Sequence, residues 1–165
     1  MTITDQRRQS NFIGLICGSE NEPKKRWPVN YWCELANRIL AENPKVKLIL
    51  FGTTKDREIT QQIAYDLPPE RVIDIAGETD LLDFCERILT CRLIVCNDTG
   101  GMHLANALGL PVVALFGPTN PLRTAPVYEA PVNIIQPPAC PPRGGLSLSE
   151  IKPESVISLL NKYTK

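Results

Sequence analysis

The 165-residue sequence lacks the features that mark several common classes of protein. No apolar run approaches the ~20 residues that a membrane-spanning helix needs, so we do not expect an integral membrane protein. Residues 1–10 are polar and lack the apolar stretch of a secretory signal. Basic and acidic residues number 18 each, and this zero net charge indicates neither nucleic acid nor an anionic membrane as a partner. We therefore expect a cytoplasmic protein.

Three motifs of nucleotide-dependent and hydrolytic enzymes are also absent. The phosphate-binding pattern G-x-x-x-x-G-K-[ST] does not occur, which argues against a P-loop NTPase. No G-x-G-x-x-G follows an expected strand, which weakens the case for a dinucleotide oxidoreductase. The nucleophile pattern G-x-S-x-G is missing, which excludes an esterase of the α/β-hydrolase type.

Patterns for metal binding and disulfide formation are equally sparse. The chain has a single histidine, His103, and its six cysteines contain no C-x-x-C pair. Several cysteines lie inside apolar runs, so we expect buried free thiols in a reducing compartment, no metal site and no cofactor. The cysteines are Cys17, Cys33, Cys85, Cys91, Cys96 and Cys140.

Short apolar runs rich in isoleucine, valine and leucine recur along the chain. Each is too short for a buried helix, and such runs are typical of strands buried on both faces of a parallel sheet. We expect strands at residues 12–17, 46–51, 72–75, 93–96 and 112–116, with 132–135 as a possible sixth.

Segments with the apolar period of a helix lie between these runs. Thr79 is placed to cap one of them, and another ends at Gly109 with Pro111 just beyond, a typical stop signal. We expect helices from about Pro28 onward and over residues 57–65, 80–90, 102–108 and 153–163.

This alternation of strands and helices predicts the fold class. It is typical of parallel strands joined by right-handed crossovers. We expect an α/β fold, a Rossmann-like doubly wound parallel sheet of five or six strands. Residues 1–11 are predicted to form a polar tail and residues 12–165 a single domain. Residues 117–150 contain eight prolines and are expected to form an irregular excursion.

The loop after the expected strand 93–96 is the first candidate site. In open parallel sheets, ligands bind beyond the carboxyl ends of the strands. Gly100 and Gly101 allow close approach of a ligand, and the amides of the following helical turn suit an anion such as a diphosphate. Thr99 can add a donor, and Asp98 can accept from a sugar hydroxyl. Ordinary helix capping and a simple turn explain the same residues, and both readings stay open.

His103 lies in the first turn of that helix and also has two readings. Its imidazole can donate to a phosphate oxygen, or it can bond to a neighbouring loop carbonyl. The sequence around it does not decide between them.

The second candidate loop, residues 18–28, holds the basic triplet Lys24, Lys25 and Arg26 in a neutral protein. Such side chains can neutralise a leaving diphosphate without a metal ion. A solvated charge run is the commoner meaning of such a triplet, and Trp27 is expected to pack beneath the loop.

The third candidate loop follows the strand 46–51 and begins with Gly52 and Thr53. A glycine and a threonine at a strand end suit contacts with a base or ribose. They also suit helix capping, which we favour here.

Residues 97–119 closely resemble the signature segment of the ADP-heptose:lipopolysaccharide heptosyltransferases, glycosyltransferase family nine; they read NDTGGMHLANALGLPVVALFGPT. The sequence KRWP at 25–28 resembles the start of the first helix in the family's donor domain. Shorter similarities lie at FG (51–52) with KDRE (55–58), at CPPR (140–143) and at IKPESV (151–156), so the resemblance runs in order over about residues 12–160. Gly101 stands where proline or leucine is common, and the tail lacks the extra cysteines of many members.

The resemblance implies a GT-B enzyme with two Rossmann-like domains, of which this chain is similar to the C-terminal, donor-binding one. It implies inverting, metal-independent transfer of heptose, or a related sugar, from an ADP-sugar to a lipopolysaccharide core acceptor, at or near the inner face of the cytoplasmic membrane. The general base is a carboxylate of the N-terminal acceptor domain, which we expect to be absent here, so no catalytic residue is assigned to this chain. The implied donor-binding residues are Ser19, Lys25, Asp98, Thr99, Gly100, Gly101, Met102 and His103.

Two alternatives remain beside this reading. The chain is able to serve as a non-catalytic nucleotide-sugar-binding module, either a remnant or half of a split enzyme. A nucleotide-sugar epimerase of the same architecture is a further possibility, but the segments 25–28 and 98–103 argue against it.

Overall fold

The computed structural model describes residues 9–19 and 23–164, and its centre is a parallel sheet of six strands. The expected tail therefore lies largely outside the described residues, as do residues 20–22 of the second candidate loop. The strands are β1 (Phe12–Ile16), β2 (Lys47–Phe51), β3 (Val72–Asp74), β4 (Cys91–Asn97), β5 (Val112–Leu115) and β6 (Val132–Ile135).

The sheet order is β3-β2-β1-β4-β5-β6, with every neighbouring pair parallel. The chain builds outward from β1 in one direction and then restarts at β4 on the other side of β1. This reversal makes β1 and β4 the topological switch point, where open sheets of this kind bind ligands. The predicted fold class is confirmed, including the sixth strand.

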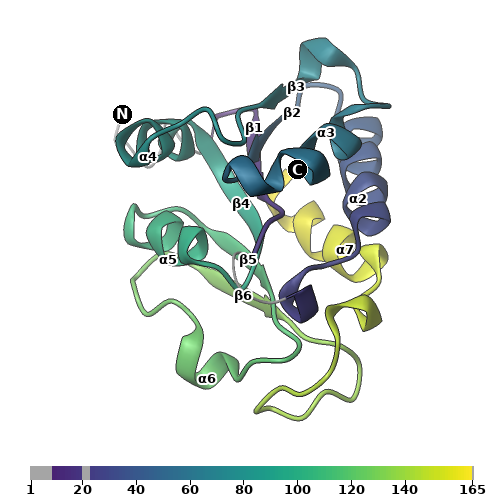
Figure 1. Cartoon of the computed structure of the whole chain (residues 1–165), viewed down its shortest axis with the longest axis vertical. Helices are drawn as coiled ribbons and strands as arrows, with labels where there is room; N and C mark the ends of the chain where they lie inside the picture. Colours follow the sequence, from purple (N-terminus) through teal and green to yellow (C-terminus); the bar gives the residue numbers. More distant parts are fainter. Residues whose placement is uncertain (1–8, 20–22, 165) are drawn as a thin grey trace.

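Helices cover both faces of the sheet (Figure 1). α2, α3 and α7 lie on one face, and α4 and α5 lie on the other, while the short α6 follows β5. The helices are α2 (Val29–Glu42), α3 (Arg57–Ala64), α4 (Leu81–Leu89), α5 (Gly100–Ala107), α6 (Pro121–Thr124) and α7 (Pro153–Thr164), with short 3₁₀ turns η1 (Pro23–Lys25), η2 (Thr54–Asp56), η3 (Pro69–Arg71) and η4 (Leu148–Glu150).

Alternation along the strands divides the core into two layers. Ile13 and Leu15 of β1 pack beneath α2 and α7, whereas Ile16 packs with α5 on the opposite face. All three side chains are buried, as expected for strands covered on both sides. This burial explains why short unbroken apolar runs predicted the strands.

Two helix predictions need correction at the helix ends, and one loop prediction needs correction as well. Asp80, not Thr79, caps α4, because its carboxylate accepts from the backbone N–H of Asp83 at 2.9 Å. α5 begins at Gly100, two residues before the expected start. The excursion over 117–150 is less irregular than expected, since it contains α6 and η4 beside the expected strand at 132–135.

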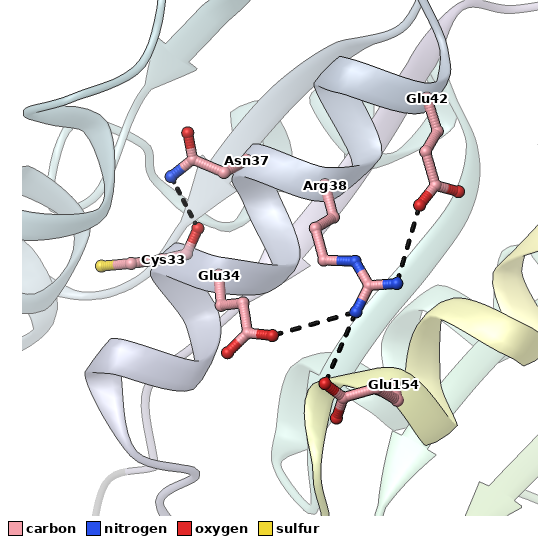
Figure 2. Close-up of polar contacts among 6 residues, drawn as sticks. All are labelled: Cys33, Glu34, Asn37, Arg38, Glu42 and Glu154. Carbon is pink, nitrogen blue, oxygen red and sulfur yellow. Dashed lines mark hydrogen bonds and ion pairs between the residues drawn. The ribbon is translucent and has the colours of Figure 1, made fainter.

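The outer side of α2 carries an ion-pair cluster that joins it to α7 (Figure 2). The guanidinium of Arg38 lies 3.9 Å from Glu34 and 3.8 Å from Glu42 on its own helix. It also lies 3.6 Å from Glu154 at the start of α7. These groups are partly to largely exposed, so each pair adds little stability to the contact between α2 and α7. Among the described residues, no helix is long and apolar enough to cross a bilayer.

Candidate functional site

A cavity of about 740 Å³ opens at the carboxyl ends of the strands, at the switch point between β1 and β4. Four connections contribute to its walls, those after β1, β2, β3 and β4. All three candidate loops of the sequence meet here. The connection between β3 and α4 is the fourth wall, which sequence reasoning missed.

The start of α5 forms one wall of the cavity. Gly100 and Gly101 line it, and a methyl group at Gly100 would meet no atom within 4 Å, so open space lies directly over the first turn. Thr99 occupies the N-cap position, yet its side chain makes no capping hydrogen bond. Among the described residues, its Oγ1 is buried and without a partner. The N–H of Met102 donates to the Thr99 carbonyl oxygen at 3.2 Å, so the amides of this first turn left for a ligand are those of Gly100 and Gly101, as expected for an anion-binding helix start.

Lys25 faces this helix start from the opposite loop. It ends the turn η1, and its Nζ lies 3.6 Å from Oδ2 of Asp98, with 25% of the lysine side chain and 9% of the aspartate side chain exposed. The same Oδ2 accepts a hydrogen bond from the hydroxyl of Thr119 at 2.7 Å. An ammonium, a carboxylate and uncapped amides thus meet at one rim of the cavity.

The basic triplet of the second loop divides into three different environments. Lys24 is exposed, Lys25 lines the cavity, and Arg26 turns back to its own loop. The Arg26 guanidinium donates to the carbonyl oxygen of Ser19 through Nε at 3.2 Å and Nη2 at 3.0 Å. Arg26 therefore shapes the loop, and within the triplet only Lys25 presents its charge to the cavity.

Trp27 packs beneath this loop, as predicted. Its side chain is 2% exposed, and its Nε1–H donates to the carbonyl oxygen of Ile151 at 2.9 Å. The ring lies edge-on to Trp32 of α2, with centroids 5.0 Å apart.

The third loop caps a helical turn, as favoured from the sequence, and it also lines the cavity. The buried carboxylate of Asp56 accepts from the Thr53 backbone N–H at 2.8 Å and from the Thr53 hydroxyl at 2.9 Å. Gly18 lies against that carboxylate so closely that a methyl group there would be 2.2 Å from Oδ1. Asp56 thereby joins the loops that follow β1 and β2.

The structure brings six of the eight implied donor-binding residues to the cavity wall. These are Ser19, Lys25, Asp98, Thr99, Gly100 and Gly101. The other two lie elsewhere: Met102 is fully buried in the core beneath α5, and His103 is exposed and outside the lining of the cavity. Among the hydrogen bonds of the described residues, none involves the His103 side chain, so the loop-carbonyl reading of this histidine finds no support.

Two polar residues that sequence reasoning did not single out shape the site. Asn97 is fully buried at the end of β4, and its Nδ2 donates to the Cys17 carbonyl oxygen at 2.9 Å, which ties the ends of β4 and β1 together. Thr119 orients Asp98 from the loop after β5. Both positions belong to the segment 97–119, so the resemblance pointed to them without indicating their contacts.

The thiols are free, as predicted, although only three of the six are fully buried. Burial raises the pKa of Cys17, Cys91 and Cys96, to about 12 for Cys91, so these thiols stay protonated near neutral pH. Among the residues that the structure describes, no group of three or more histidine, cysteine, aspartate or glutamate side chains is placed to hold a metal ion.

The fold and the cavity define an α/β domain in which the start of α5 lines a cavity at the switch point. Residues 2–143 match the family model described as glycosyltransferase family 9 (heptosyltransferase). The chain therefore belongs to this family.

Individual relatives agree with that assignment. Lipooligosaccharide heptosyltransferase 2 of Haemophilus influenzae is 33% identical over 163 residues, covering 92% of this chain and 46% of that protein. Lipopolysaccharide heptosyltransferase 2 of Escherichia coli K12 is 42% identical over 119 residues, covering 70% and 34%. The solved structure of E. coli ADP-heptose lps heptosyltransferase II superposes with a TM-score of 0.82 at 35% identity, covering 94% and 47%. This chain spans about half the length of the relatives that it matches along nearly all of its own length.

Proposed function

We propose that this chain is the donor-binding part of a heptosyltransferase and holds the diphosphate of an ADP-sugar against the start of α5. Support for the donor comes from the E. coli relative at 35% identity, which is named ADP-heptose lps heptosyltransferase II. Support for the partial role comes from the coverage, since the matched region is 46–47% of the length of two relatives.

The observation that carries the proposal is the unpartnered hydroxyl of Thr99. A buried polar atom without a partner costs free energy, so such an atom in a cavity wall indicates a ligand that satisfies it. It lies at the N-terminus of α5, where the helix dipole favours negative charge. Lys25 brings an ammonium to the same rim, where it is paired with the Asp98 carboxylate at 3.6 Å. A diphosphate fits this combination of donors and charge.

The remaining walls of the cavity are proposed to contact the nucleoside and the sugar of the donor. The loop with Gly52 and Thr53 lies at the β2 side of the cavity and forms the wall against which a ribose or base would lie. Asp98 lies beside Lys25 at the β4 side, where its carboxylate is able to accept a hydrogen bond from a hydroxyl of the sugar. The donor would then lie across the switch point, with the diphosphate between sugar and nucleoside.

This arrangement suits stabilisation of the leaving group. As the bond between the anomeric carbon and the phosphate oxygen breaks, negative charge grows on the departing ADP. The Lys25 ammonium and the α5 amides oppose that charge from fixed positions, and such preorganised groups are effective without a metal ion. We assign the acceptor site and the base that deprotonates the acceptor hydroxyl to a second domain. Transfer, with inversion at the anomeric carbon, would then take place only when both parts meet.

Calorimetric titration tests the donor site directly. ADP, UDP and GDP are titrated into the wild-type chain, the Lys25→Ala variant and the Lys24→Ala variant. We expect a preference for ADP and a loss of about tenfold or more in affinity for Lys25→Ala, because a charged hydrogen bond to phosphate is removed. Lys24→Ala is the matched control, since that lysine is exposed and should leave the affinity within about twofold. Failure of the wild-type chain to bind any of the three nucleotides would refute the proposal.

A second reading makes the chain a non-catalytic binding module or one half of a split enzyme. An assay with ADP-heptose and a lipopolysaccharide core acceptor separates the two. We expect the 165-residue chain to bind donor and transfer nothing by itself. Transfer that appears when the N-terminal half of a relative is added marks a split enzyme, and full turnover by the chain alone would contradict its assignment as a donor-binding part.

A further inference from the structure

The ion pair at the cavity rim is held from behind by a residue outside the cavity wall. Thr119 lies in the loop between β5 and α6, and its hydroxyl donates to Oδ2 of Asp98 at 2.7 Å. That same oxygen faces the Lys25 ammonium at 3.6 Å. Thr119 does not line the cavity itself, and its hydrogen bond to Asp98 links it to the cavity wall.

Thr119 is in turn fixed by a distant segment of the chain. A methyl group at Gly144 would lie 2.3 Å from the Thr119 carbonyl oxygen, so the two backbones are in direct contact, and Gly144 has a φ of 83° that favours glycine. The next residue, Gly145, donates its N–H to the carbonyl oxygen of Gly117 at 2.8 Å. The backbone of residues 144–145 therefore holds the backbone of residues 117–119 in place.

The charges at the rim suggest what the hydrogen bond from Thr119 to Asp98 does. A carboxylate beside an anion site repels a diphosphate unless its charge is directed to a cation. The hydroxyl of Thr119 and the ammonium of Lys25 converge on one oxygen of Asp98, which restricts the rotation of the carboxylate. Without the hydroxyl, the carboxylate would be free to turn, and the lysine that it anchors would lose its fixed position.

We propose that Thr119 is a positioning residue for donor binding, which acts by holding the Asp98 carboxylate on Lys25. The inference rests on the proposed function, because it takes the diphosphate as the ligand of this rim. It assigns a role to the threonine at the end of the segment 97–119, which makes no contact with the cavity of its own.

The experiment measures the Kd of ADP by calorimetry for Thr119→Val and Thr119→Ser. Valine keeps the shape of threonine but removes the donor, so we expect binding about five- to tenfold weaker, whereas serine restores the affinity to within about twofold of wild type. Thr124→Val is the matched control, because the Thr124 hydroxyl donates to the backbone carbonyl of Asn120 at 3.1 Å instead. Thermal unfolding of each variant confirms that it is folded.

A double-mutant cycle with Asp98→Ala distinguishes positioning from a general structural effect. If Thr119 acts through Asp98, Thr119→Val should change the Kd by less than about twofold once the carboxylate is gone. A full effect in the Asp98→Ala background, or equal losses for Thr119→Val and Thr124→Val, would overturn the inference. Unchanged ADP affinity in Thr119→Val would also overturn it while leaving the proposed function intact; absence of ADP binding by the wild-type chain would overturn both.

Discussion

The indole N–H of Trp27 donates to the carbonyl oxygen of Ile151 at 2.9 Å, across 124 positions of the sequence. This bond joins the loop after β1, which carries Lys25, to the residue that leads into α7. Both groups are buried, so the bond is shielded from water. The C-terminal part of the chain thus supports the donor-side loop from below.

Replacement of Trp27 by phenylalanine removes this donor and leaves the Ile151 carbonyl oxygen buried without it. Trp32→Phe is the matched control, because Trp32 is equally buried while its Nε1 is without a partner among the described residues. Both changes lose similar ring volume, so we expect Trp27→Phe to lower the free energy of unfolding by about 1–3 kcal/mol more than Trp32→Phe. Urea unfolding followed by circular dichroism measures the difference. Equal losses would show that the bond adds nothing.

Some parts of the molecule could be predicted from the sequence, whereas long-range contacts such as the bond from Trp27 to Ile151 could not. Strands such as β1 and β4 were predictable because burial on both faces leaves an unbroken apolar run. Their adjacency placed the loops with Lys25 and Thr99 at one edge, since carboxyl ends of parallel strands meet there. The bond from Trp27 to Ile151 has no such local signal, because an indole N–H can find its acceptor anywhere in the fold.

Helix ends show the same limit. The expected cap Thr79 and the actual cap Asp80 are neighbours of similar capping ability, and only the backbone geometry decides between them. His103 and Met102 follow the glycines in sequence, yet the helical turn directs one to solvent and the other to the core. The helical rotation of about 100° per residue separates such neighbours once α5 is known to begin at Gly100.

Arg71 is predicted to be a long-range cap for α2. Its guanidinium donates at 2.6–3.0 Å to the carbonyl oxygens of Leu40 in the last turn of α2, of the C-cap Asn43, and of Val46 just before β2, so it serves the helix end and the turn that follows it. Lysine cannot reproduce this fork, so Arg71→Lys should lower the free energy of unfolding by about 1–3 kcal/mol. Arg57→Lys is the control, since its exposed pair with Glu78 should contribute at most about 0.5 kcal/mol. Chemical denaturation of both variants gives the comparison, and a similar small loss in each would contradict the capping role.

Two glycines of the cavity should respond oppositely to a methyl group. Gly18→Ala places the methyl 2.2 Å from the Asp56 carboxylate, which must move and lose its bonds to Thr53, so we expect a loss of about 2 kcal/mol or more in stability. Gly100→Ala meets no atom within 4 Å and should leave stability unchanged or raise it by up to about 1 kcal/mol. Its methyl nevertheless occupies the space proposed for the diphosphate, so ADP should bind about tenfold more weakly. Thermal unfolding and ADP titration measure the two effects; undiminished ADP binding in Gly100→Ala would place the diphosphate elsewhere.

The buried thiols predict a loss of stability at alkaline pH. Burial raises the pKa of Cys91 to about 12 in the folded chain, whereas an unfolded thiol titrates at about 8.5. Between these values the unfolded chain releases a proton that the folded chain keeps, so the free energy of unfolding falls as pH rises. One such thiol should lower it by about 2 kcal/mol between pH 8 and pH 10.

Cys91→Ala tests this directly, because the variant lacks the titrating group and should show a correspondingly shallower decline. Urea unfolding at pH 8, 9 and 10 compares the slopes of the two chains, which removes the contribution of every group that they share. Val95→Ala is the control, because it removes a buried side chain of β4 that does not titrate and should leave the slope close to that of wild type. Parallel declines for wild type and Cys91→Ala would mean that the folded chain accommodates the Cys91 thiolate. That outcome would contradict the burial of this side chain at the start of β4, beside Gly14 of β1.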